Sequence, residues 1–260
     1  MPGHLIRPLP RPRARRTLFC LSFCGGGTAP FRPWAEVLGE DTELALYCYP
    51  GREARYGEPC ARSWDELLDG ALAALGEVSG RACVLFGHSM GAHVAFDLAL
   101  RAERTGLPAP EAVVVSAAPA PGEPSGPGGP PPHSGNTDDE LLRWMLGAGQ
   151  LAEAVRGEPE LLAMAVEVFR ADLLTAESRR HRGGDRLRAP LHLLHGVADD
   201  LGEADVAAWR ARAAGPFTAT RLDGGHFYTP QVWRLLPRYM PVPAGPPAGT
   251  VQSPAGGPRG

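Results

Sequence analysis

A short segment in the first half of the chain, Gly87-His88-Ser89-Met90-Gly91, places a serine between two glycines. Glycines at this spacing permit a tight turn between a strand and a helix, which holds the serine Oγ clear of the backbone. The flanking residues fit such a turn, because an apolar run over 82–86 precedes the serine and a helical pattern over 91–98 follows it. The segment therefore predicts that Ser89 is a nucleophile.

A serine nucleophile needs a base to take its proton, and the base needs a carboxylate to orient it. In α/β-hydrolases the chain order is serine, acid, histidine. We assign His226 as the general base, because it follows two glycines after the last predicted strand. Asp199 and Asp200 follow the preceding strand, and only one of them can face the imidazole. We assign Asp199 as the acid and expect Asp200 to cap the turn, with the reverse assignment as the alternative.

Two backbone N–H groups must stabilise the oxyanion that forms during attack on a carbonyl. One is expected from Met90, directly after the nucleophile. The other is expected from Cys24, in the glycine-rich loop that follows the first predicted strand. An ordinary glycine turn is the simpler interpretation of this loop, but its place after the first strand favours a role in the site.

Apolar runs and helical patterns alternate around these residues. We predict strands at 17–23, 43–49, 82–87, 111–117, 190–196 and 217–223, and helices at 64–78, 90–105, 203–213 and 227–239. Several strands are apolar throughout, as expected for a parallel sheet buried on both faces. The pattern predicts an α/β fold over 17–240, with a mostly parallel, doubly wound sheet.

The interval from about 119 to 189 has no predicted strand. It opens with a Pro/Gly-rich stretch and continues with helical patterns at 138–146 and 158–176. Such an insertion usually covers the strand ends where ligands bind, so we predict a helical cap, or lid; a linker to a small extra domain is the alternative. The Arg/Pro-rich residues 1–16 are predicted to be mobile, and the Pro/Gly-rich residues 241–260 to form a disordered tail.

The composition argues against several other classes of protein. Basic and acidic residues number 26 and 29, so there is no basic excess for nucleic-acid binding. Every basic residue is an arginine, which excludes a lysine Schiff base. The scarcity of Lys, Ile and Asn suggests GC-rich bacterial coding DNA. No stretch approaches the ~20 apolar residues of a membrane helix.

The remaining cysteine, histidine and arginine residues give no second site of comparable strength. The chain has 5 cysteines without CxxC spacing, which indicates free thiols in a reducing cytoplasm. His192 and His195 fall on opposite faces of a predicted strand and so make a poor metal pair. We find no motif for a cofactor or metal site and expect neither. Five arginines gather at the end of the cap: Arg179, Arg180, Arg182, Arg186 and Arg188. A solvated helix face is the simpler interpretation; a docking site for an acidic partner or phosphate is the alternative.

With these residues in place, the chain resembles the type II thioesterases, which are free-standing α/β-hydrolases of polyketide and non-ribosomal peptide synthesis. The resemblance rests on the following segments: Phe23-Cys24-Gly25-Gly26-Gly27, Tyr49-Pro50-Gly51-Arg52, Arg55-Tyr56-Gly57-Glu58-Pro59, Gly87-His88-Ser89-Met90-Gly91-Ala92, Arg170-Ala171-Asp172 and Gly224-Gly225-His226-Phe227. The family's acid lies three residues after the glycine that ends its strand, which matches Asp199. The family usually has alanine where this chain has Cys24.

The resemblance implies an editing enzyme that hydrolyses acyl thioesters on the phosphopantetheine arm of acyl or peptidyl carrier proteins. Aberrant or stalled acyl groups would leave through an acyl-Ser89 intermediate. We expect a cytoplasmic monomer. A carboxylesterase or a chain-releasing thioesterase of the same fold is one alternative. A non-catalytic binder of carrier proteins is another, although such a protein would have no need of the three catalytic side chains.

Overall fold

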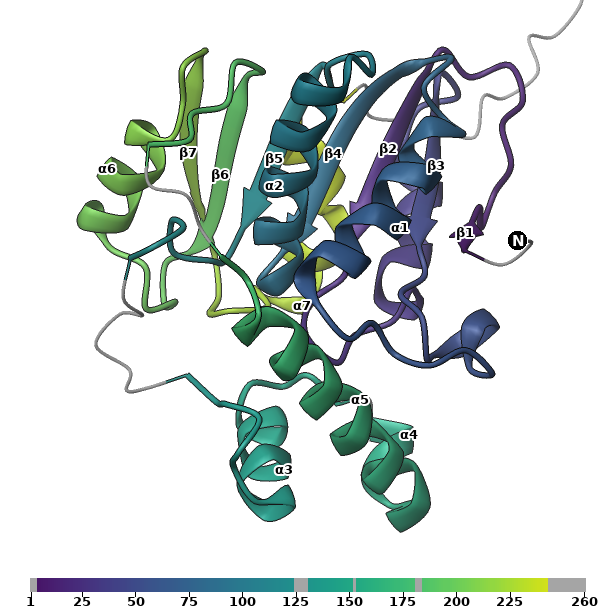
Figure 1. The fold of residues 1–260 in the computed structure, drawn as a ribbon, viewed down its shortest axis with the longest axis vertical. Helices are drawn as coiled ribbons and strands as arrows, with labels where there is room; N and C mark the ends of the chain where they lie inside the picture. The colour runs from purple at the N-terminus through teal and green to yellow at the C-terminus, as the bar shows by residue number, and fades with distance from the viewer. Residues whose placement is uncertain (1–3, 124–130, 152, 181–183, 243–260) are drawn as a thin grey trace, which may run out of the picture.

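A seven-stranded sheet forms the centre of the computed structural model, which describes residues 4–123, 131–151, 153–180 and 184–242 (Figure 1). Its strands are β1 (Leu5–Ile6), β2 (Arg16–Leu21), β3 (Thr42–Tyr47), β4 (Ala82–His88), β5 (Ala112–Ser116), β6 (Leu191–Gly196) and β7 (Phe217–Leu222). They are ordered β1-β3-β2-β4-β5-β6-β7 across the sheet. Only the pairing of β1 with β3 is antiparallel. Strands β2 to β7 therefore all end at the same edge, as the predicted parallel sheet requires.

Helices cover both faces of the sheet. Helices α1 (Trp64–Gly76), α2 (Met90–Thr105) and α6 (Glu203–Ala211) pack on one face (Figure 1). The 3-10 helices η1 (Ala29–Glu36) and η3 (Leu236–Tyr239) lie on the other, with α7 (Pro230–Leu235). Neighbouring strand residues alternate between the two cores: Leu85 points into one, and Val84 and Phe86 into the other. This explains why the strands are apolar throughout rather than at every second residue.

Local signals decide where the helices begin and end. The Ser63 side chain accepts a hydrogen bond from the Glu66 N–H and caps α1. The helix predicted at 227–239 starts later, because Thr229 caps it and Pro230 occupies its first position. It then tightens into η3, with Pro237 at its start. Another short 3-10 helix, η2 (Glu53–Arg55), was not predicted.

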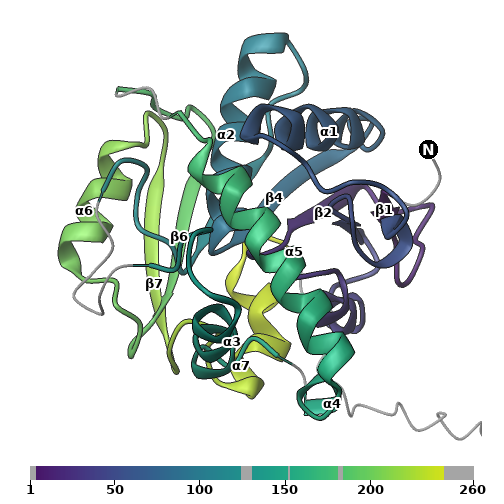
Figure 2. The same ribbon diagram turned by 60° about the horizontal axis from the view of Figure 1, so that its bottom comes forward.

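The predicted cap lies between β5 and β6. It contains α3 (Asp138–Gly147), α4 (Glu153–Arg156) and α5 (Pro159–Glu177), of which only α4 was not predicted. The cap has a small apolar core of its own, made by Leu141, Met145, Leu151, Val166, Phe169 and Leu173. Figure 2 shows α5 running across the edge where the strands end. The cap thus covers the edge at which the candidate catalytic residues are expected.

The N-terminal segment differs from the prediction of a mobile arm. Leu5–Ile6 pair with β3 as an edge strand, and the sheet strand predicted from 17 already begins at Arg16. The Arg11 guanidinium donates hydrogen bonds to four backbone carbonyls between Ala35 and Thr42, at 2.6–3.1 Å. An arginine carries five donors, so one side chain can tie this segment to the loop before β3.

The predicted tail falls mostly outside the described residues, which end at 242. Its first part packs on the fold, because Val242 is buried beside Leu236 and Met240. Within the part of the chain that the structure describes, no helix is both long and apolar enough to cross a membrane.

Candidate active site

Ser89 sits in a strained turn between β4 and α2. Its backbone adopts φ +54° and ψ −119°, a conformation that side-chain-bearing residues rarely take. The Ser89 N–H donates to the Ser116 carbonyl at 2.8 Å. A Cβ on Gly87 would lie 1.8 Å from the Gly91 carbonyl oxygen, and a Cβ on Gly91 2.3 Å from the Leu21 carbonyl oxygen. Both glycines are therefore required by backbone packing, as the sequence predicted, and the turn holds Ser89 in place.

His226 and Asp199 meet in the loops after β7 and β6. The distance between His226 Nδ1 and Asp199 Oδ1 is 3.4 Å. The Asp199 side chain is 9% exposed and also accepts the Asp200 N–H at 3.0 Å, whereas Asp200 itself is exposed. The geometry thus favours Asp199 over Asp200 as the partner of the imidazole.

Ser89, Asp199 and His226 line one cavity of about 460 Å³. Its other walls are mostly apolar and include Trp144 and Leu173 of the cap. No direct hydrogen bond joins the Ser89 hydroxyl to His226 among the described residues. Catalytic hydrogen bonds are often longer before substrate binds, so this arrangement is compatible with proton transfer between the two side chains.

The two predicted oxyanion donors lie at the ends of β2 and β4. Met90 is the first residue of α2 and lines the cavity beside Ser89. Cys24 lies in the loop after β2. This loop lies next to the start of α2, since a Cβ on Gly91 would be 2.4 Å from the Ser22 carbonyl oxygen. Neither N–H group hydrogen-bonds to another residue that the structure describes. Free donors at a helix N-terminus and in a neighbouring loop are what an oxyanion site needs.

A buried polar chain beneath His226 was not predicted. His88 Nδ1 lies 3.0 Å from Ser116 Oγ, which lies 2.7 Å from the Tyr228 hydroxyl. The ring centroids of His88 and His226 are 5.2 Å apart. Burial, and secondly the nearby His226, hold the pKa of His88 well below its usual value, while burial raises the pKa of Tyr228. Both groups are therefore neutral near pH 7 and add no charge beneath the imidazole.

A second unpredicted feature is a buried ion pair between Arg52 and Asp172. The side chains are each 7% exposed, and two hydrogen bonds of 2.7 and 2.5 Å join them. Burial alone would lower the pKa of Arg52, but the Asp172 carboxylate outweighs it and raises the pKa. Both residues lie in segments that carry the family resemblance, yet nothing in their spacing indicates that they meet.

The other sequence candidates do not form a second site. The arginine cluster separates: Arg179 bonds Asp97, Arg188 contacts Glu103, and Arg182 lies outside the described residues. His192 bonds Thr218 and not His195. Over the described ranges, no group of three metal-ligating side chains comes together.

Residues 16–237 match the thioesterase domain family. The chain belongs to the thioesterase family. It is 32% identical to thioesterase PikA5 of Streptomyces venezuelae over 239 residues, covering 87% of this chain and 80% of that protein.

Solved structures agree with this result. The type II thioesterase BorB of the borrelidin biosynthetic cluster is 33% identical with a TM-score of 0.77, and covers 90% of this chain and 96% of its own. YbtT, a type II thioesterase of the yersiniabactin pathway, is 29% identical with a TM-score of 0.78, covering 91% and 96%. The predicted fold class, the type II family and the assignment as a thioester hydrolase are confirmed.

Proposed function

We propose that this thioesterase removes acyl groups from the phosphopantetheine arm of acyl or peptidyl carrier proteins in polyketide or non-ribosomal peptide synthesis. The proposal rests on one observation: Ser89 is held in a strained turn and lines the same cavity as the paired side chains of His226 and Asp199. The names of the relatives, which are type II thioesterases of such pathways, support the carrier-bound substrate. In this proposal the protein's own side chains supply the chemistry, without a cofactor.

Acylation would begin when His226 takes the proton of Ser89 and Oγ attacks the thioester carbonyl carbon. The carbonyl oxygen becomes an oxyanion and accepts hydrogen bonds from the N–H groups of Met90 and Cys24. The carbon–sulfur bond then breaks, and the proton on His226 passes to the departing pantetheine thiol. Asp199 holds the imidazole and stabilises its positive charge.

Deacylation would repeat the sequence with water as the nucleophile. His226 takes a proton from water, hydroxide attacks the acyl-Ser89 carbonyl, and the same two N–H groups bind the second oxyanion. Collapse breaks the bond to Ser89 Oγ, which recovers its proton from His226. A free carboxylic acid leaves through the cavity whose walls the cap supplies.

The decisive experiment compares wild type with Ser89→Ala, using an acyl group loaded on a carrier protein and a simple oxygen ester. We expect free acid from the thioester, and at least a ~10⁴-fold loss of kcat in the variant. Ser79→Ala, outside the cavity, is the matched control. Cleavage of the ester alone would instead indicate a carboxylesterase, and a cyclised product a chain-releasing enzyme. Tight carrier binding that survives without any turnover would indicate a binder.

A second comparison separates the two neighbouring aspartates. Asp199→Asn removes the carboxylate that faces His226, so kcat is expected to fall about 10⁴-fold. Asp200→Asn changes an exposed side chain and is expected to keep kcat within a few-fold of wild type. The reverse result would assign the orienting role to Asp200.

The setting of the enzyme is part of the same proposal. We infer a cytoplasmic protein that meets its carrier protein as a monomer. Light scattering at micromolar concentration tests the monomer, and a dimer would contradict it.

A further inference from the structure

The loop after β2 aims the Cys24 N–H in one direction. The Gly26 N–H donates to the Phe23 carbonyl at 2.9 Å, and the peptide bonds of the structure are trans. In a trans peptide the C=O and N–H point to opposite sides. With the Phe23 oxygen bonded to the Gly26 N–H, the Cys24 N–H points away from that bond, and it donates to no other residue that the structure describes. The orientation of this one peptide therefore sets one of the two proposed oxyanion donors.

The next peptide, between Cys24 and Gly25, is held at both ends by side chains of the cap. Gln150 Nε2 donates to the Cys24 carbonyl at 2.6 Å, from the loop between α3 and α4. The Gly25 N–H donates to Asp172 Oδ2 at 2.7 Å, on α5. Gly25 has φ +72°, so the chain turns sharply at this point. The cap therefore contacts the backbone one peptide beyond the proposed donor.

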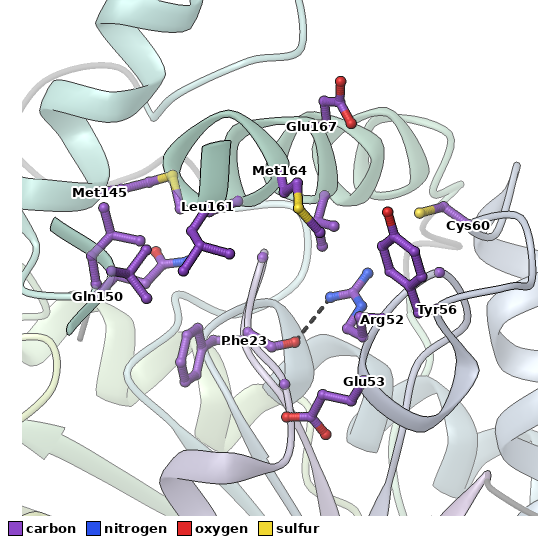
Figure 3. Close-up of a pocket in the computed structure, with 18 of the residues that line it drawn as sticks. Phe23, Arg52, Glu53, Tyr56, Cys60, Met145, Gln150, Leu161, Met164 and Glu167 are labelled. Atoms are coloured by element: carbon purple, nitrogen blue, oxygen red, sulfur yellow. Dashed lines mark hydrogen bonds between the residues drawn. The ribbon is translucent and has the colours of Figure 1, made fainter. Parts of the chain in front are cut away.

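Arg52 completes this arrangement from the opposite side. Its Nη1 donates to the Gly26 carbonyl at 2.9 Å and to Asp172 Oδ2 at 2.7 Å, and its Nη2 donates to Asp172 Oδ1 at 2.5 Å. Figure 3 shows the guanidinium between the cap helix and the loop, with its bond to the loop dashed. Arginine presents several donors in a fixed plane, so one side chain can join the loop and the carboxylate. The loop lines a second cavity of about 440 Å³ together with Arg52, and the ion pair holds the loop on that side.

We propose that Asp172 and Arg52 are positioning residues for the oxyanion site: they hold the loop so that the Cys24 N–H faces the reacting carbonyl. The proposal rests on the proposed function, because it assigns Cys24 as an oxyanion donor. It also gives the cap a role in the chemical step, besides covering the acyl chain. Neither side chain touches the substrate in this role.

The test is Asp172→Asn, which keeps the shape of the side chain and removes its charge. A loop that is no longer held stabilises the transition state less but binds the substrate as before, so kcat falls while KM stays constant. We expect kcat for each titrated active site to fall about 10²-fold, with KM within about threefold. The inhibition constant of an alkyl boronic acid, whose adduct on Ser89 mimics the oxyanion, should rise by a similar factor.

The matched control is Asp138→Asn. Asp138 also bonds an arginine of α5, Arg170, but its side chain is exposed and forms no hydrogen bond with the loop after β2 among the described residues. We expect wild-type kcat and boronic acid inhibition for this variant. Wild-type values for Asp172→Asn would overturn the proposal. So would a loss of activity that vanishes after correction for the titrated active sites, since it would reveal only a structural role.

A second variant keeps the test open if Asp172→Asn does not fold. Gln150→Leu removes the bond to the Cys24 carbonyl without leaving an unpaired charge, and should show the same pattern more weakly. Labelling by a fluorophosphonate, carried to completion, tests the proposed function separately, because its end point requires an activated Ser89 and does not depend on how fast the label reacts. Labelling that persists in Ser89→Ala would contradict the nucleophile assignment. If Asp172→Asn were fully labelled and its inhibition constant for the boronic acid were that of wild type, the positioning role would be contradicted and the proposed function would stand.

Discussion

The two loops that would stabilise the oxyanion are built in different ways. The turn at Ser89 is held by its own backbone, because Gly87 and Gly91 allow strand and helix to pack more closely than a Cβ would permit. The loop at Cys24 is held from a distance, by Tyr49, Arg52, Gln150 and Asp172. Tyr49 and Arg52 lie just after β3, and the other two lie in the cap. One donor is thus fixed by local geometry and the other by tertiary contacts.

This difference bears on how each loop responds to mutation. A turn fixed by close backbone packing has no room to adjust, so a change there affects folding. A loop fixed by several separate hydrogen bonds can lose one and remain folded, so a change there affects the precision of the site. Mutations at the Ser89 turn should therefore lower mainly the free energy of unfolding, and mutations around the Cys24 loop mainly kcat.

The largest effect is expected from Gly91→Ala. Its new Cβ would lie 2.3 and 2.4 Å from two backbone carbonyl oxygens of the β2 end, which cannot move aside as a side chain can. We expect a loss of about 4 kcal/mol or more in the free energy of unfolding, measured by urea denaturation. Gly76→Ala, whose Cβ meets nothing within 4 Å, should instead gain about 0.5–1 kcal/mol. Equal stability of the two variants would refute the packing argument.

The free energy of unfolding is expected to depend on pH through His88, the last residue of β4. Its folded-state pKa is held low by burial, so the unfolded chain binds a proton near pH 6.5 that the folded protein refuses. Stability is therefore complete above about pH 6.5 and falls below it, by up to about 1.4 kcal/mol per pH unit.

Urea unfolding from pH 5 to 7.5 measures this slope. His88→Gln should reduce it without abolishing it, because burial also lowers the pKa of His192 and His195. His133→Gln, at an exposed position, is the control. An unchanged slope in His88→Gln would mean that its burial costs nothing on acidification.

Tyr49→Phe is expected to lower the free energy of unfolding by less than Gly91→Ala does. The buried hydroxyl donates to the Ser22 carbonyl at 2.9 Å, and its removal leaves that oxygen unpaired. Unfolding free energy should fall by about 1–2 kcal/mol. The kcat should fall less than in Asp172→Asn, since Ser22 lies two residues before the proposed donor. Tyr239→Phe, at an exposed position, is the control. If Tyr49→Phe lost more kcat than Asp172→Asn, the Tyr49 hydrogen bond would matter more for the site than the Asp172 contact.

The smallest effect is expected from Cys24→Ala. The proposed oxyanion donor is the backbone N–H, which alanine retains, so kcat should stay within about twofold of wild type. The Cys24 thiol lies 3.6 Å from the Phe169 carbonyl, a weak contact. Steady-state kinetics on the loaded carrier protein would check this, and a loss of tenfold or more would show that the thiol itself takes part.

The same division explains what could be predicted from the sequence. The turn at Ser89 was predictable because its glycines and flanking elements are contiguous, and α2 matches its predicted bounds, Met90–Thr105. The approach of His226 to Asp199 was predictable because the two residues follow strands that end at one sheet edge. The ion pair was not found, because Arg52 and Asp172 are 120 residues apart and only the folded cap brings them together. The packed N-terminal segment was missed for a related reason: its composition is that of a mobile arm, but Arg11 finds its acceptors between the end of η1 and the start of β3.

The contacts of the cap with the loop after β2 also limit how this enzyme can be redesigned. Exchanging residues 119–189 for the corresponding segment of a relative is an obvious way to change the range of acyl groups accepted. Such a chimera would keep Ser89, Asp199 and His226, yet it would lose activity unless the new segment supplied side chains equivalent to Gln150 and Asp172. The graft must therefore be designed together with the loop at Cys24, because the side chains that hold this loop come from the exchanged segment itself.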